Sequence, residues 1–327
     1  MSEQFSGHGI EAGLLQRLRA WRDVLPPLIL FQSLRVCGSP IYLAMSLVTV
    51  IAISAILSGG EVDSVVTYPK FANRIAFHSV TSDWRDLLLI LVAFVVGILP
   101  AAATMRSGAI YAAQRDAEPI MAGLRLVCSR AVSMLLVLLL PMVCVLGLLV
   151  PVAALSLADR ISGIGDAIAE LLGALISPLV IVIGLIGAGS IVAIPLGWAS
   201  LSIEKRNDPF DALSRGYEYL YRRPVQLALY LVINVLTAQF LGWMANWVAY
   251  TADGLSSVVY RLGSGGESLP IAIRVVLAHL PLAVTMTSFF AVLGAVYLLL
   301  RQDANEQEIE EIVVSTVDQR TVDLPSL

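Results

Sequence analysis

Apolar residues in this chain are gathered into six long runs that are separated by polar segments. The runs cover residues 41–57, 87–104, 131–157, 171–202, 225–250 and 270–300. A helix rises about 1.5 Å per residue, so about 20 apolar residues cross the roughly 30 Å hydrocarbon core of a bilayer. We therefore predict an all-α fold, a polytopic transmembrane helical bundle with about six spans.

Prolines and small residues modify this picture in the longer runs. Pro141 and Pro151 lie in the third run, and Pro178 and Pro195 lie in the fourth. Because a proline removes a backbone hydrogen bond from a helix interior, we expect these helices to be kinked or broken, or to run partly along the membrane surface. The sequence GLIGAGS at 184–190 has no following lysine, so it predicts close helix packing rather than phosphate binding.

A charged segment, residues 204–224, separates the fourth and fifth runs with the sequence EKRNDPFDALSRGYEYLYRRP. Asp208 and Pro209 predict a helix start, because Asp accepts from a free backbone amide and proline suits the first turn. The apolar stripe that follows comprises Phe210, Leu213, Tyr217, Leu220 and Tyr221. The polar stripe comprises Asp211, Ser214, Arg215, Glu218 and Arg222. We predict an amphipathic helix at the membrane surface whose charges are solvated against lipid headgroups or other helices.

A second charged segment, residues 106–130, precedes the third run and repeats this arrangement. Glu118 and Pro119 stand where Asp208 and Pro209 stand in the later segment. Residues 1–40 are predicted to form an N-terminal amphipathic region, because arginines flank a helical stripe of leucines. The candidate surface-helix or interaction residues are Asp208, Pro209, Phe210, Arg215, Tyr217, Arg222, Glu118 and Pro119.

The distribution of Lys and Arg predicts the orientation in the membrane. With six crossings, fifteen of the 21 Lys and Arg residues fall on one side and the other six on the opposite side. Since cytoplasmic loops carry an excess of these residues, we expect the first side to be cytoplasmic. This places both termini in the cytoplasm and the protein in the cell inner membrane. Residues 41–300 then form the transmembrane domain, and residues 301–327 form an acidic cytoplasmic tail.

Composition supports an integral membrane protein and limits its partners. Hydrophobic residues make up 57% of the chain and charged residues 14%, whereas about a quarter of a soluble domain is charged. A net charge of -4 without a clustered basic face argues against a nucleic-acid partner, so we expect membrane lipids and other membrane-protein subunits. Cys37, Cys128 and Cys144 lack metal-ligand spacing and are expected to behave as small apolar residues.

No residue pattern predicts a reaction or a bound cofactor. His78 has no second ligand three or four positions away, and the sequence GSGG at 263–266 lies in a polar loop. We therefore expect a non-enzymatic protein without catalytic residues, cofactor or metal.

Polar residues in the later runs are few. Asn234 and Gln239 lie near the middle of the fifth run, where amides either join helices or line a polar path. We favour hydrogen bonds between helices, because we expect no buried carboxylate or basic residue in any span. His279 is expected at or above the outer interface.

The two charged segments together resemble a pattern in a broad group of prokaryotic polytopic membrane proteins. That group includes the membrane domain attached to glycerophosphodiester phosphodiesterases. The similar features are the PFDAL core and SRGYEY of residues 204–224, and SGAIYAAQRDAEPIMAGLRLVCSR at 107–130. The resemblance extends over about residues 85–300. It implies a membrane domain that is not catalytic, so it assigns no catalytic residue to this chain.

Three functions are compatible with these features. The first is a non-enzymatic integral membrane protein that acts as a scaffold, a partner subunit or a lipid-organising element. The alternative is a transporter or channel for a small solute, which would suit long proline-containing helices and a repeated segment-plus-span unit. A membrane enzyme that acts on lipid ranks last, since the sequence contains none of the expected catalytic patterns.

Overall fold

The computed structural model describes residues 28–57, 84–113, 118–158, 165–204, 208–264 and 269–305. Within these ranges the chain is helical and contains no strand. The predictions for the amphipathic stretch before residue 28, for His78 and for the acidic tail after residue 305 lie outside the described residues.

Within the described residues, six helices are long and apolar enough to cross a membrane, which confirms the predicted all-α, multi-pass class. They are α3 (Pro40–Leu57), α6 (Trp84–Ala112), α8 (Ala131–Ala158), α9 (Gly165–Ile203), α11 (Pro224–Ser264) and α12 (Ile271–Asn305). The shorter elements are α2 (Leu28–Gln32), the 3₁₀ helix η1 (Ser33–Gly38), α7 (Ile120–Ser129) and α10 (Pro209–Arg222). The long helices continue through their prolines without a break, so of the predicted alternatives, kinked or broken, the broken helix is wrong.

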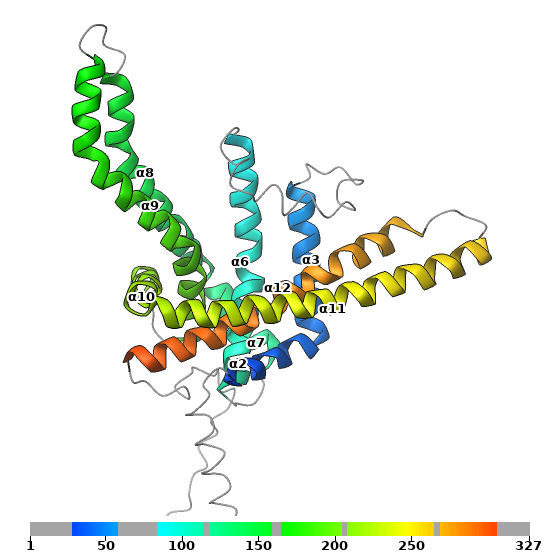
Figure 1. Ribbon diagram of the computed structural model, residues 1–327. Coiled ribbons are helices and arrows are strands. Elements are labelled where there is room, and N and C mark those ends of the chain that lie inside the picture. Colours follow the sequence, from blue (N-terminus) through cyan, green and yellow to red (C-terminus); the bar gives the residue numbers. More distant parts are fainter. Residues whose placement is uncertain are drawn as a thin grey trace, which may run out of the picture.

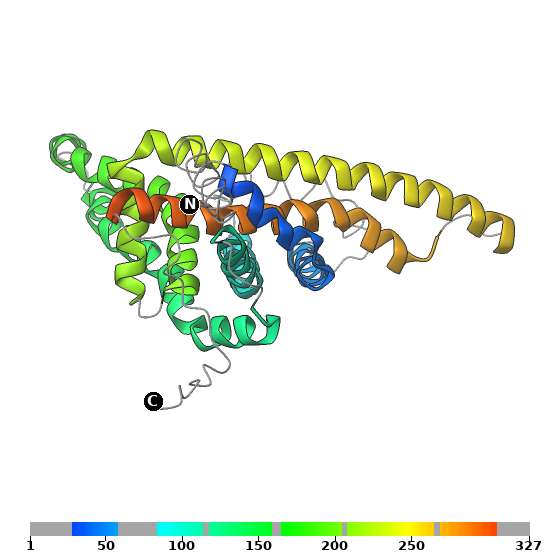
Figure 2. The ribbon, with the colours of Figure 1, turned by 90° about the horizontal axis from the view of Figure 1, so that it is seen from below.

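The long helices meet at one end of the molecule and diverge from it (Figure 1). Helices α8 and α9 form one hairpin, and α11 and α12 form another that points in a different direction, with α3 and α6 between them. Viewed from below, α11 and α12 lie side by side while α3 and α6 are seen almost end-on (Figure 2). We call the meeting end the base; it contains the starts of α3, α8 and α11 and the ends of α6, α9 and α12.

Glycines allow the helices of the base to approach closely. A methyl group added to Gly108 of α6 would lie 2.1 Å from the carbonyl oxygen of Ala291 in α12. A methyl group on Gly294 of α12 would lie 2.0 Å from the carbonyl oxygen of Met105 in α6. The two glycines thus place the backbones of α6 and α12 in direct contact, as small residues do between membrane helices.

Helix α10 packs on α9 in the same way. A methyl group on Gly216 of α10 would lie 2.5 Å from the carbonyl oxygen of Ala193, and one on Gly189 of α9 would lie 2.8 Å from the ring of Tyr217. The prediction that residues 184–190 serve helix packing is therefore confirmed at Gly189. It is wrong at positions 184 and 187, where an added methyl group would meet no atom within 4 Å.

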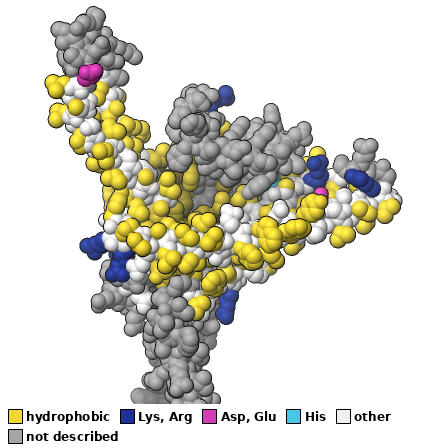
Figure 3. Space-filling model, viewed as in Figure 1, with side chains coloured by type: hydrophobic (Ala, Val, Ile, Leu, Met, Phe, Trp, Pro, Cys, Tyr) yellow, Lys and Arg dark blue, Asp and Glu magenta, His cyan; other side chains and the backbone are white. Residues whose placement is uncertain are grey.

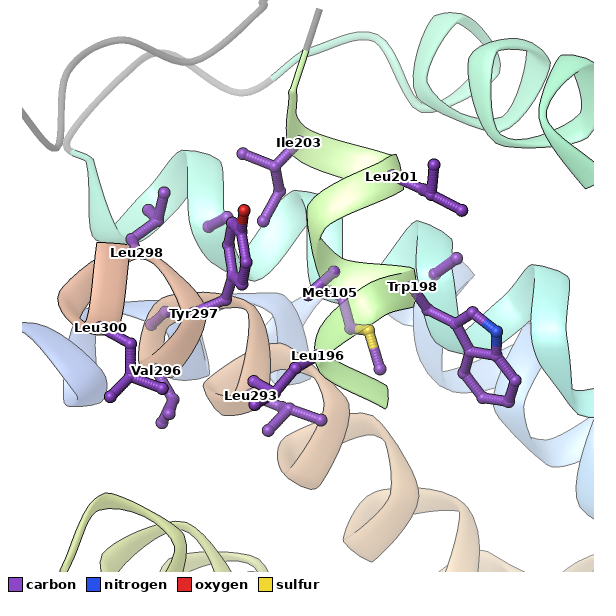
Figure 4. Close-up of a cluster of buried hydrophobic side chains, with 14 of the residues drawn as sticks. Met105, Leu196, Trp198, Leu201, Ile203, Leu293, Val296, Tyr297, Leu298 and Leu300 are labelled. Atoms are coloured by element: carbon purple, nitrogen blue, oxygen red, sulfur yellow. The ribbon is translucent and has the colours of Figure 1, made fainter. Parts of the chain in front are cut away.

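The largest buried cluster also lies at the base. It joins side chains of α6, α9 and α12, including Met105, Leu196 and Leu293, each at most 1% exposed (Figure 4). The outer halves of the hairpins differ: Leu175 of α9 is 76% exposed and Leu262 of α11 is 84% exposed. Figure 3 shows hydrophobic side chains over the visible face of both hairpins. In a membrane these surfaces face lipid or another protein.

Candidate functional site

Arg106 is the most deeply buried charged residue among those described, with 1% of its side chain exposed. It lies near the end of α6. Its Nε and Nη2 donate to the two carboxylate oxygens of Glu118 at 2.8 and 3.1 Å, and its Nη1 donates to the carbonyl oxygen of Ser202 at 2.6 Å. One arginine therefore connects α6, the segment before α7 and the end of α9. The expectation that no span contains a buried basic residue is wrong.

Glu118 does not start a helix in the way that the later segment does. Helix α7 begins at Ile120, Pro119 occupies the capping position, and no side chain makes a cap hydrogen bond there. The carboxylate of Glu118 is instead 4% exposed and is paired with Arg106. The parallel with Asp208 and Pro209 therefore fails: Pro119 precedes the first residue of α7, whereas Pro209 is the first residue of α10.

Arg130 provides a second connection to the end of α9. This residue follows α7, and its Nη1 donates to the carbonyl oxygen of Leu201 and, at 2.6 Å, to that of Glu204. The last carbonyl groups of a helix have no partner within the helix and carry its negative dipole end. Arg106 and Arg130 together satisfy this end of α9 and place positive charge beside it.

Glu204, directly after α9, links α9 to two further helices, α10 and α12. Arg215 of α10 donates from Nη1 to both carboxylate oxygens of Glu204 at 2.6 Å. The hydroxyl of Tyr297 in α12 donates to the same carboxylate and is 3.0 Å from the hydroxyl oxygen of Ser200 in α9. We call the set formed by Arg106, Glu118, Arg130, Ser200, Ser202, Glu204, Arg215 and Tyr297 the base network.

The electrostatics of the base network act in opposite directions on Arg215 and Arg130. Burial, the largest single influence, would lower the pKa of Arg215, but the charges of Glu204, Tyr297 and Asp211 together outweigh it, so the pKa is raised. Burial and then the charge of Arg106 lower the pKa of Arg130, and Glu204 opposes this shift. Burial, followed by the charge of Glu204, raises the pKa of Tyr219, whose ring packs edge-on against Tyr297. The guanidinium of Arg215 thus remains charged beside Glu204.

The start of α10 is where the sequence predicts it, but the side chain of Asp208 is not used as predicted. Pro209 is the first helical residue and Asp208 occupies the capping position. Asp208 is exposed, and its side chain makes no cap hydrogen bond. Arg215 is also not a solvated surface charge, because its pair with Glu204 holds it against the base. Arg222 does remain at the surface, 71% exposed and 2.7 Å from Glu218.

The buried face of α10 is rotated from the predicted apolar stripe. It comprises Ala212, Leu213, Gly216 and Tyr219. Phe210 is 62% exposed, and Tyr217 and Tyr221 lie at the edge, with hydroxyls that donate to carbonyl oxygens of α9 at 3.0 and 3.1 Å. Small residues face α9 because they allow the backbones to approach, whereas the tyrosines reach around to polar partners.

The intramembrane polar residues agree with the predictions only in part. Asn234 is fully buried, and its Nδ2 donates to the carbonyl oxygen of Phe289 at 3.1 Å, which confirms a hydrogen bond between helices. Gln239 is exposed, because five positions along a helix place it on a different side of α11. His279 of α12 is fully buried, and its Nδ1 lies 2.7 Å from the carbonyl oxygen of Val275. Its place at or above the outer interface stays a prediction.

The base network is suited to fastening helices together. Every member has a partner in the network, and no three His, Cys, Asp or Glu side chains in the described ranges gather as metal ligands would. The sequence did contain a signal for it: arginines and a glutamate stand where apolar runs end, at Arg106, Arg130 and Glu204. Such charges are predicted from the sequence to be solvated, although charges of opposite sign at neighbouring span ends can also pair with one another.

Comparisons of the chain with models of protein families, with curated proteins and with solved structures found no match. The functional argument therefore rests on the residues and geometry of this chain.

Proposed function

We propose that this chain is a non-enzymatic scaffold of a prokaryotic inner membrane that organises lipid around two diverging helical hairpins. The observation that carries the proposal is the exposure of large apolar side chains along the outer halves of α8–α9 and α11–α12. Helices that diverge in this way expose more surface to lipid than the same helices in a closed bundle. Polar contacts, by contrast, are concentrated at the base.

The base network supports a scaffolding role for the other end of the molecule. Two carboxylates and three arginines connect five helices there, and their bonds leave each charged group engaged. Such an arrangement holds helix ends in fixed positions without requiring a substrate. In the transporter alternative a polar path would run through the spans, yet Asn234 and Gln239 lie on different sides of α11.

Orientation is the second part of the proposal. The excess of Lys and Arg on one side supports a cytoplasmic location for the base and for both termini. Cys128 is exposed on α7 at the base, so a membrane-impermeant maleimide should label it in inverted vesicles and not in intact spheroplasts. A Cys128→Ser variant that carries Arg261→Cys, at the outer end of α11, should show the opposite pattern. Labelling of Cys128 in spheroplasts would contradict the orientation.

The lipid-organising role can be tested with spin-labelled phospholipid in reconstituted membranes. Lipid in contact with protein is motionally restricted, so the spectrum reports how many lipids contact each chain. The proposal predicts more restricted lipid per chain than a compact six-helix reference protein shows. An equal or smaller number would mean that protein covers the hairpins, which would contradict the proposal. Saturable solute flux into protein-containing vesicles, absent from empty vesicles, would favour the transporter alternative instead.

A further inference from the structure

An apolar cavity of about 170 Å³ lies between α3, α6 and α12, within the segments that are apolar enough to cross a membrane. Val50 and Ile53 of α3 line it on one side, Gly97 of α6 on another, and Met286 of α12 on a third. Trp198 of α9 also lines it. This space is separate from the base network.

The polar atoms at its wall are already engaged. The hydroxyl of Thr49 donates to the carbonyl oxygen of Met45 at 2.8 Å, and the hydroxyl oxygen of Ser46 accepts from Thr287 at 2.8 Å. The indole nitrogen of Trp198 donates to the carbonyl oxygen of Met134 at 3.0 Å. A polar solute would therefore find few hydrogen-bond partners in the cavity, whereas an apolar occupant would need none.

The size of the cavity and its opening identify the kind of occupant. An apolar protein cavity of about 150 Å³ stays dry and accepts benzene, so this one accommodates a hydrocarbon segment of about six carbons. Phe94 both lines the cavity and is 51% exposed, and the neighbouring Val95 is 42% exposed. The cavity is therefore continuous with the apolar surface that α6 presents to the membrane.

We propose that this cavity binds the hydrocarbon tail of a membrane lipid, which enters between α3 and α6 beside Phe94. The proposal deepens the lipid-organising function and rests on it, since the occupant comes from the surrounding bilayer. Membrane lipid is the apolar molecule at highest concentration beside that opening. The missing side chain of Gly97 provides part of the space, because a methyl group there would meet only the end of Ile53, at 3.7 Å.

Trp198 offers a direct test, since it lines the cavity and is only 3% exposed. In a variant with Trp21, Trp84, Trp243 and Trp247 replaced by Phe, Trp198 is the remaining tryptophan. Brominated acyl chains quench tryptophan on contact, so phospholipid vesicles with brominated tails should remove most of its fluorescence. Little or no quenching would overturn the proposal. None of the four substituted residues lines the cavity, so the cavity itself is unaltered in this test.

Two further substitutions locate the route of the tail. In the same background, Gly97→Leu should fill the cavity and restore Trp198 fluorescence. The matched Gly147→Leu, on a face of α8 where an added methyl group meets no atom within 4 Å, should leave quenching unchanged. Equal quenching in the Gly97→Leu protein would show that the tail does not occupy the cavity, and would overturn the proposal.

A second single-tryptophan protein separates this proposal from the proposed function. Trp243 on α11 is 55% exposed, and the lipid-organising function requires it to contact lipid. Quenching of Trp243 without quenching of Trp198 would remove the cavity site and leave the lipid-facing hairpin intact. Absence of quenching at Trp243 would count against the proposed function itself.

Discussion

The base and the outer halves of the hairpins use their side chains in opposite ways. At the base, Arg106 and Ser202 are at most 1% exposed and Gly108 touches the backbone of α12, whereas Leu175 and Leu262 in the outer halves are at least 76% exposed. In lipid, apolar side chains gain little by packing against one another, because lipid tails are equally apolar. Helices therefore remain together where polar groups pair or glycines permit backbone contact, and they separate where neither is present.

The largest effect on stability is expected when one member of the buried ion pair between Arg106 and Glu118 is removed. Arg106→Met leaves Glu118 buried without its guanidinium and leaves the carbonyl oxygen of Ser202 without its donor. We expect the free energy of unfolding to fall by about 3–5 kcal/mol, measured by denaturant titration in mixed micelles. The control is Arg222→Met, which removes an exposed pair with Glu218 and should cost less than about 1 kcal/mol. Similar losses in the two variants would contradict the account.

A second test addresses the glycine contact between α6 and α12. Gly108→Ala would place a methyl group 2.1 Å from the carbonyl oxygen of Ala291, so the two backbones would have to separate. Overpacking of this kind costs about 1–3 kcal/mol, which the same titration should report. Gly147→Ala, in the exposed part of α8, meets no atom within 4 Å and should leave stability equal or slightly higher. An unchanged free energy of unfolding in the Gly108→Ala protein would show that stability does not require the close crossing of α6 and α12.

The pH dependence of stability should also differ between the two regions. Cys37 in η1 lies at the base, and burial raises its pKa from 9.0 to about 11. The folded protein therefore keeps the proton to higher pH than the unfolded chain does, so stability falls as the pH rises from 9 to 11. We expect a loss of about 1 kcal/mol, because the side chain is only partly buried.

The part of this fall in stability that is due to Cys37 can be measured by comparison of two variants. Cys37→Ala should flatten the fall in stability across this range, while Cys144→Ala, at an exposed position of α8, should leave it in place. The difference between these variants also cancels the contribution of Tyr219, whose raised pKa makes stability fall above pH 10 in both proteins. If the free energy of unfolding of the Cys37→Ala protein fell with pH as steeply as that of the unsubstituted protein, the assignment of a partly buried thiol at the base would be contradicted.

The smallest effect is expected at the start of α10. Asp208 is exposed and its side chain makes no cap hydrogen bond, so Asp208→Ala should change the free energy of unfolding by less than about 0.5 kcal/mol. Glu204→Gln, four positions earlier, should cost several times more, because it weakens the bonds from Arg215 and Tyr297. A larger loss for Asp208→Ala than for Glu204→Gln would reverse the assignment of these carboxylates.

The elements of the fold could be predicted because their signals are local. Apolar runs of sufficient length identify the six long helices, and Pro209 marks the start of α10. The base network could not be predicted in the same way, because its bonds join residues far apart in the sequence, such as Arg106 and Ser202. A charge at the end of a span has the same local pattern whether it faces water or an opposite charge on another helix.

Helix faces were predicted least well where small or bifunctional residues decide the packing. Phe210 and Tyr221 belong to the predicted apolar stripe of α10, yet they are 62% and 54% exposed. The closest approach to α9 is instead made at Gly216, whose lack of a side chain leaves no hydrophobic signal. The divergence of the hairpins was likewise not predictable, since an apolar residue has the same pattern in a helix contact as against lipid.

The central claim is that paired charges at the base, rather than apolar packing, hold the helix ends together. A double-mutant cycle on Arg106 and Glu118 tests it most directly, with Arg106→Met, Glu118→Leu and the combined variant. We predict a coupling energy of about 2 kcal/mol or more, and a combined variant that is more stable than Arg106→Met alone. The same cycle on Glu218 and Arg222 should give less than about 0.5 kcal/mol. Additive losses at Arg106 and Glu118, with no more coupling than the exposed pair, would contradict the claim.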